Sequence, residues 1–268
     1  MGSPLPRRRG GRSGWAAVLL PALVGLTVLG SCSPTRPQAA PGRTSTTTIA
    51  HPSAAGQLAP FVSAARALDG RLRAAAALVN GSIHSTGASF DASTVQAVHR
   101  ADPQPVAAAI PSGAPPALLQ PVLLVYAGLS SRRAAFNWIT EGTRPAADPD
   151  YPRMMQCLRN GAGPASAFER DMAALQRVAA ATEPFLPAAP DSRSAEELAV
   201  RIEWIQLGNN GCGSCGGFVP DAWATVTWAP SPTQDTSAFG PVAGNINGLN
   251  FTATYRADSR WEIVLQAC

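Results

Sequence analysis

The stretch PPALLQPVLLVYAGL, residues 115–129, decides the fold that this sequence is expected to adopt. Apolar residues lie on nearly every side of its helical projection, a pattern typical of a helix buried in the middle of a domain. A proline suits the first helical position, because the N–H that it lacks would have no partner there. We therefore predict a central helix from Pro115 or Pro116 to Leu129, against which the neighbouring segments pack.

Two amphipathic helices are predicted before this central helix. A shorter one is expected at residues 91–101, where Asp91 or Ser93 can accept a hydrogen bond from a backbone N–H of the first turn. A longer one is expected at residues 58–79, because its apolar residues recur every three or four positions and so share one helical face. These residues are Phe61, Ala65, Leu68, Leu72, Ala75 and Val79.

Two further helical segments follow the central helix. Residues 152–160 predict a short helical turn that carries Cys157. Residues 166–182 predict an amphipathic helix, with residues such as Phe168 and Leu175 on its apolar side. Residues 58–190 are therefore expected to form the helical part of the protein.

The period of the sequence changes after residue 195. Leu198, Val200, Ile202 and Trp204 alternate with more polar residues, as in a strand with one buried face. A helix that begins at the capping box Ser194-x-x-Glu197 is the competing interpretation. Because Val, Ile and Trp favour strands, we predict a strand from Ala199 to Leu207.

The rest of the chain is rich in strand-forming residues. Strands are predicted at residues 223–228, 249–256 and 261–266, and the last two should form a hairpin. A run of helices followed by a run of strands predicts an α+β fold, with N-terminal helices packed on a small C-terminal antiparallel sheet. We expect residues 58–268 to form a single domain, whose β-rich part is residues 195–268.

This order of elements faintly resembles the cone-shaped fold of the nuclear transport factor superfamily. The resemblance covers only the succession of helices and a final hairpin, and it implies an alternative way to arrange the same α+β elements. It implies nothing about activity, because one fold carries many functions.

The N-terminal residues 1–31 have the parts of a secretory signal peptide. Arginines at positions 7, 8, 9 and 12 precede an apolar run from Trp15 to Leu29, and small residues then precede Cys32. Leu29-Gly30-Ser31-Cys32 resembles the lipobox of bacterial lipoproteins. The resemblance implies that the chain is cut before Cys32 and that the Cys32 thiol carries a diacylglyceryl group. An ordinary signal peptide with a chance cysteine is the alternative, and export by the general or the twin-arginine route stays open.

Two lipid chains on Cys32 would meet the requirement for stable membrane anchoring. The predicted location is thus the cell membrane, lipid-anchored, on the extracytoplasmic face. Residues 32–57 are rich in Pro, Ser, Thr and Ala and predict a disordered tether between lipid and domain.

The charge of the predicted mature chain excludes one class of partner. The basic residues are all arginine, a bias typical of a GC-rich genome such as that of an actinobacterium. Once the arginines before Cys32 are removed, 17 arginines face 17 acidic residues. Because nucleic-acid binding depends on a basic surface, we expect no nucleic-acid partner.

The cysteines after Cys32 predict disulfide bonds. Cys157, Cys212, Cys215 and Cys268 are an even number in a chain expected to be exported, and they allow three pairings. Cys212-Gly-Ser-Cys215 also has the spacing of thiol–disulfide oxidoreductases, which makes redox catalysis the alternative function. A zinc site made of all four is a further alternative, although no second close pair supports it.

Other catalytic signatures are absent. The sequence lacks the motifs of serine hydrolases, zinc proteases and phosphate-binding loops, and we predict no catalytic residue, metal or cofactor. Four tryptophans of the C-terminal third, Trp204, Trp223, Trp228 and Trp261, are candidates for a ligand pocket. We expect a lipoprotein that acts without catalysis, by binding an unidentified ligand or an envelope protein.

Overall fold

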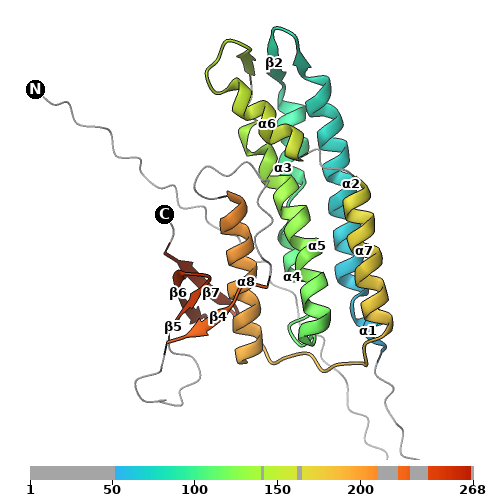
Figure 1. Ribbon diagram of the computed structural model, residues 1–268, viewed down its shortest axis with the longest axis vertical. Helices are drawn as coiled ribbons and strands as arrows, with labels where there is room; N and C mark the ends of the chain where they lie inside the picture. The colour runs from blue at the N-terminus through green and yellow to red at the C-terminus, as the bar shows by residue number, and fades with distance from the viewer. Residues whose placement is uncertain (1–51, 140–141, 162–164, 211–222, 230–240, 267–268) are drawn as a thin grey trace, which may run out of the picture. The chain divides into compact units, whose positions relative to one another are not determined.

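The central helix expected from residues 115–129 is α5, which extends from Pro116 to Ala134 (Figure 1). Pro115 immediately precedes the helix and Pro116 occupies its first position, as predicted. Most of the large apolar side chains of α5 are buried, among them Leu118, Leu123 and Tyr126. The helix is central because α2, α6, α7 and α8 all contact it.

The computed structural model describes residues 52–139, 142–161, 165–210, 223–229 and 241–266. These residues form helices on the N-terminal side and a sheet on the C-terminal side, so the predicted α+β class is confirmed. Among these residues, no helix is long and apolar enough to cross a membrane. The helices and one 3₁₀ turn are α1 (Ala54–Gln57), α2 (Ala59–Gly81), α3 (Ala92–Arg100), α4 (Gln104–Ala108), α5, η1 (Ala135–Trp138), α6 (Tyr151–Gly161), α7 (Ala165–Ala180) and α8 (Arg193–Asn210).

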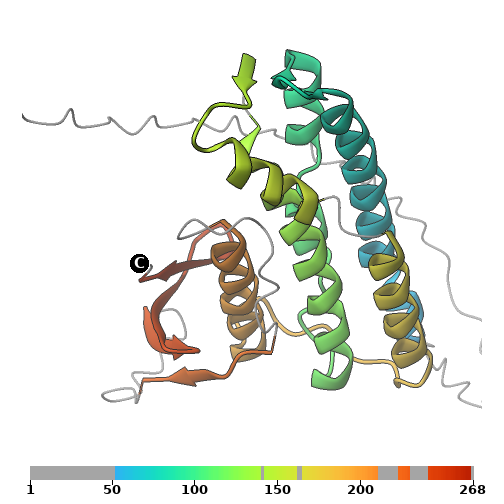
Figure 2. The same cartoon turned by 45° about the horizontal axis from the view of Figure 1, so that its top comes forward.

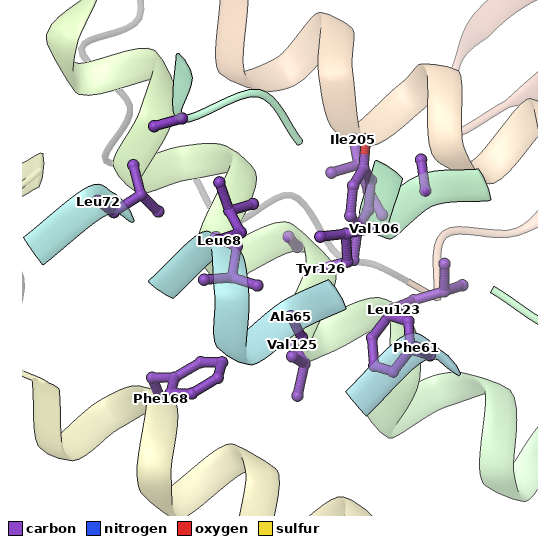
Figure 3. Packing of buried hydrophobic residues seen from close by; sticks show 14 of the residues in the cluster. Phe61, Ala65, Leu68, Leu72, Val106, Leu123, Val125, Tyr126, Phe168 and Ile205 are labelled. Carbon is purple, nitrogen blue, oxygen red and sulfur yellow. The ribbon is translucent and has the colours of Figure 1, made fainter. Parts of the chain in front are cut away.

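The predicted apolar face of α2 is confirmed. Every residue of the periodic set from Phe61 to Val79 is buried, and α3, α4 and α5 pack against this helix. Figure 3 shows the resulting core, where Phe61 and Leu68 of α2 meet Leu123 and Tyr126 of α5. This core is the larger of the two in the described residues.

Local signals also placed the other predicted helices correctly. Asp91 caps α3, since its side chain accepts a hydrogen bond of 2.7 Å from the backbone N–H of Thr94. The helical turn around Cys157 is α6, and the amphipathic segment after it is α7. Phe168 and Leu175 of α7 are buried in the larger core.

A small sheet within the helical part was not predicted. Its strands are β1 (Ile83–His84), β2 (Gly87–Phe90) and β3 (Gly142–Pro145), which pair antiparallel in that order. The strands are too short to show a periodic pattern, and β2 pairs with a strand that follows it by about 50 residues. The backbone approaches closely here: a Cβ on Gly87 would lie 2.3 Å from the carbonyl oxygen of Arg144.

The predicted strand from Ala199 to Leu207 is wrong, because these residues belong to helix α8. The helix also begins before the alternative capping box at Ser194, since the Ser192 hydroxyl accepts a hydrogen bond of 3.3 Å from the backbone N–H of Ala195. The alternation was misleading for a physical reason, which is that α8 is buried on two sides. Leu198 and Ile205 pack in the larger core, whereas Val200 and Trp204 pack in the smaller one.

The C-terminal sheet is an antiparallel meander. Its strands pair in the order β4 (Val226–Trp228), β5 (Val242–Ile246), β6 (Leu249–Tyr255) and β7 (Trp261–Leu265). The predicted final hairpin is confirmed as β6 and β7, and β4 coincides with the end of the strand predicted at 223–228. Strand β5 was not predicted.

One helix joins the two parts of the fold. Helix α8 contacts α5 on one side and strands β6 and β7 on the other, and Figures 1 and 2 show it between them. The inner face of the sheet packs on α8 through Ile246, Phe251 and Ala253. The sheet therefore buries one face against a helix, whereas Thr227, Asn250, Thr252 and Val264 of its other face are exposed.

Candidate functional site

The solvent-facing side of the C-terminal sheet carries an uncharged polar surface. Side chains alternate between the two faces of a strand, so residues that pair across strands lie on the same face. The pairs Thr227–Asn245, Asn245–Asn250 and Thr252–Val264 are on the face opposite α8. Thr227, Asn250 and Thr252 are exposed there. We call this surface the outer sheet face.

Three side-chain amides form a hydrogen-bonded row across the outer sheet face. Asn245 donates from Nδ2 to Oδ1 of Asn250 at 3.0 Å, and Asn250 donates from Nδ2 to Oε1 of Gln266 at 3.5 Å. The backbone N–H of Gly248 donates to Oδ1 of Asn245 at 2.8 Å, which anchors the start of the row. These hydrogen bonds orient the three amides relative to one another.

This amide row lines an open pocket of about 370 Å³. Besides the three amides, the hydroxyl-bearing side chains of Thr227 and Thr252 contribute to its wall, and no ionisable side chain of the described residues does. The nearest charged position along β7 on this face is Glu262, which is paired with Arg256. As far as the described residues line it, the pocket therefore offers amide and hydroxyl groups and no formal charge.

The turn between β5 and β6 positions the amide row. Asn247 and Gly248 have positive φ angles of 47° and 92°, the conformation of a two-residue type I′ hairpin. This turn puts Asn245 directly opposite Asn250. Because an Asn-Gly pair between alternating residues is a strong hairpin signal, this turn could have been predicted, although it was not.

Contacts on the inner side of the sheet support the strand that borders the pocket. The Arg193 guanidinium of α8 lies 4.0 Å from the centre of the Trp228 ring. The Trp228 ring in turn meets Phe251 edge-on, with a centroid distance of 5.2 Å. Gly244 leaves room for this packing, because a Cβ there would lie 2.4 Å from the Phe251 ring.

A buried carboxylate lies on α8 beside these contacts. Glu196 is 3% exposed, and one of its carboxylate oxygens pairs with Arg193 at 2.9 Å while the other has no hydrogen-bond partner in the described part of the chain. Burial raises the pKa of Glu196, and the positive charge of Arg193 opposes that increase. Arg193 thus binds both a carboxylate and an aromatic ring.

The four candidate tryptophans have different surroundings. The Trp228 side chain packs against the smaller core on the inner side of the sheet, and the residue also borders the pocket. Trp204 is buried in the smaller core, and Trp261 packs against that core while its Nε1 donates to the carbonyl of Pro190 at 3.0 Å. Trp223 packs against the larger core and stacks on Arg201, with 4.3 Å from the guanidinium carbon to the ring centre.

The cysteine predictions fall mostly outside the described residues. Cys32, Cys212, Cys215 and Cys268 all lie in segments that the structure does not describe. Cys157 is described: it is fully buried on α6 and is not a free thiol. Within the described ranges, no group of three or more His, Cys, Asp or Glu side chains could hold a metal ion.

Comparison of the chain with protein-family models, curated proteins and solved structures finds no match.

Proposed function

We propose that this protein is a membrane-anchored extracytoplasmic lipoprotein whose C-terminal sheet binds an uncharged, hydroxyl-rich ligand such as a neutral glycan. The anchor is argued from the sequence around Cys32 and from the apolar-poor segment that follows it. The ligand class is argued from one observation, the amide row Asn245, Asn250 and Gln266, which lines an open pocket to which the described residues contribute no ionisable side chain.

The chemistry of the amide row favours hydroxyl groups. A side-chain amide has two N–H donors and an oxygen that accepts two hydrogen bonds, so each member of the row keeps capacity for a ligand. A hydroxyl group both donates and accepts, and it matches either end of an amide. Because the row is already ordered by its internal hydrogen bonds, binding costs less conformational entropy.

The charge of the pocket favours a neutral ligand. An anion or cation would lose its hydration without gaining an opposite charge, since none of the described residues that line the pocket is ionisable. Val264 lies beside Thr252 on the same face and is 58% exposed, so it offers an apolar contact next to the polar row. Sugar rings combine polar edges with apolar C–H faces and suit such a surface.

Binding of a neutral oligosaccharide tests this proposal. The probe is a hexamer of β-1,4-linked N-acetylglucosamine, titrated calorimetrically into the full chain in detergent. Asn250→Ala, which interrupts the row, should weaken binding about tenfold, the loss expected for hydrogen bonds worth about 1.4 kcal/mol. Thr254→Ala is the matched control, because Thr254 lies on the same strand and face but does not line the pocket.

The two possible failures have different meanings. If the hexamer does not bind the unaltered chain, the ligand class is wrong. If it binds equally well to the unaltered chain and to Asn250→Ala and Gln266→Ala, the amide row is not the site.

The anchor is tested separately, by the intact mass of the natively exported protein. We expect a chain that begins at Cys32 and carries the mass of a diacylglyceryl group. The same sample, alkylated before and after graded reduction, also tests the alternative oxidoreductase function. If a mild reductant exposes Cys212 and Cys215 while the domain stays folded, catalysis replaces binding as the proposed function.

A further inference from the structure

A second, smaller hollow lies in the helical part, between α3 and the end of α5. Its volume is about 90 Å³. Its apolar lining comes from Val95 and Val98 of α3, from Phe136 of η1 and from Ile139 just after it. Arg133, Asn137 and His99 supply the polar part of the lining. The lining of the hollow is thus largely apolar and includes the cationic side chain of Arg133.

Arg133 has no counter-charge within reach among the described residues. Its guanidinium donates from Nη1 to Oδ1 of Asn137 at 2.9 Å, which fixes its orientation. No carboxylate oxygen in the described part of the chain lies within 4.0 Å of a guanidinium nitrogen of Arg133, the limit for an ion pair. Burial removes part of the hydration of the Arg133 charge, and this loss lowers the pKa of the side chain. The negative charge of Asp102 raises the pKa of Arg133 without forming an ion pair. The neighbouring Arg132, in contrast, is paired with Asp69 at 2.5 Å.

We propose that this hollow is a binding site for a small alkyl carboxylate, with Arg133 as the anion-binding residue. A guanidinium presents its N–H groups as a planar fork that fits the two oxygens of a carboxylate. A bound carboxylate would supply the negative charge that balances Arg133. The apolar residues around it would contact a short hydrocarbon chain, whose transfer from water is favourable by about 0.8 kcal/mol per CH2 group.

The size of the hollow restricts the ligand to a few heavy atoms. Pockets for drug-sized ligands typically have about 300 to 1,000 Å³, well above the 90 Å³ here. A nucleotide or a sugar is too large. The carboxylate can belong to a free short-chain acid or to the C-terminal residue of a peptide, and both present the same chemistry to Arg133.

Titration with isobutyrate tests the site. Binding to the full chain in detergent is followed by ligand-observed NMR, with isobutyramide as an uncharged probe of the same shape. We expect isobutyrate to bind at least tenfold more tightly than isobutyramide. Arg133→Gln should weaken isobutyrate binding at least tenfold. Arg100→Gln is the matched control, because Arg100 is exposed on α3 and does not line the hollow.

A second variant separates loss of the site from loss of the fold. Val95→Phe fills the apolar part of the hollow but keeps Arg133, and it should weaken binding of isobutyrate as well. N-acetylalanine, which imitates a peptide C-terminus, distinguishes the two sources: tighter binding than isobutyrate indicates a peptide, and weaker binding indicates a free acid. The proposal is overturned if isobutyrate does not bind, or if folded Arg133→Gln or Val95→Phe binds it as the unaltered chain does.

Discussion

At the residue scale, Asp69 holds together helices that are distant in the sequence. Its carboxylate is almost buried and pairs with Arg73 of the same helix at 2.7 Å and with Arg132 of α5 at 2.5 Å. The Arg132 side chain is itself only 14% exposed. Removal of the carboxylate would therefore leave a mostly buried positive charge without its partner.

We expect Asp69→Ala to lower the free energy of unfolding by about 3 kcal/mol, because loss of one partner of a buried ion pair is strongly destabilising. Asp258→Ala is the control, since Asp258 and its partner Arg260 are 53% and 80% exposed. The control should change stability by less than about 0.5 kcal/mol. Urea denaturation measures both, and equal losses would contradict a special role for Asp69.

Glu196 makes stability depend on pH. Burial raises its pKa above the ordinary value of 4.5, so the folded chain binds this proton more tightly than the unfolded chain does. The stabilisation that comes from this tighter proton binding is complete below pH 4.5, and it is lost as the pH rises through the pKa of Glu196 in the folded chain. The carboxylate is costly once ionised, because among the described residues only one of its oxygens has a partner.

Glu196→Gln removes this titration. We therefore expect the variant to gain stability relative to the unaltered chain as the pH is raised from about 4 to about 7. Urea denaturation at both pH values measures the difference. A difference that stays constant, or that shifts in favour of the unaltered chain, would show that burial does not disfavour the ionised carboxylate.

At the scale of elements, the C-terminal sheet depends on a glycine. A Cβ at Gly244 would lie 2.4 Å from the Phe251 ring and 2.6 Å from the backbone oxygen of Thr227. The ring could move, but the backbone oxygen belongs to the paired strand β4 and cannot move without loss of pairing. The close approach of β4, β5 and β6 thus requires a residue without a side chain.

We expect Gly244→Ala to destabilise the protein by about 1 to 3 kcal/mol, the usual cost of overpacking. Gly128→Ala should have the opposite effect and increase the stability of the protein. Gly128 lies inside α5, and a Cβ at this position would have nothing within 4 Å, so alanine there should stabilise by up to about 1 kcal/mol. Thermal denaturation of both variants compares them, and a stabilised Gly244→Ala would refute the close packing.

At the scale of the whole molecule, the proposed disulfides would tie the helices to the C-terminal region. Cys157 is fully buried on α6 and is not a free thiol. Its predicted partners, Cys212, Cys215 and Cys268, all follow α8 in the sequence. A bond to any of them would close a loop of tens of residues and restrict the unfolded chain.

Reduction should therefore lower stability by about 2 to 4 kcal/mol, the typical effect of such a bond. The measurement is the melting temperature with and without a strong reductant. Cys157→Ala should lower the melting temperature of the oxidised protein and make the effect of reduction smaller. A melting temperature that neither reduction nor Cys157→Ala changes would contradict a structural bond at Cys157.

Much of the helical part could be predicted because its signals are local. The face of α2 from Phe61 to Val79 follows from periodicity, and the start of α3 follows from Asp91. The final hairpin was also predictable from strand-forming residues around a turn. The amide row was not, because an asparagine on a strand has no visible role until its neighbours across the sheet are known.

The sequence by itself determined the α+β class, the central helix and the final hairpin, since apolar periodicity and turn residues act within one element. Only the tertiary structure decided that α8 is a helix, because its apolar residues serve two cores at once and imitate the alternation of a strand. It likewise decided the pairing of β2 with β3 and the meeting of Asn245, Asn250 and Gln266. Such contacts depend on which distant segments pack together, and periodicity along one segment carries no information about its partner.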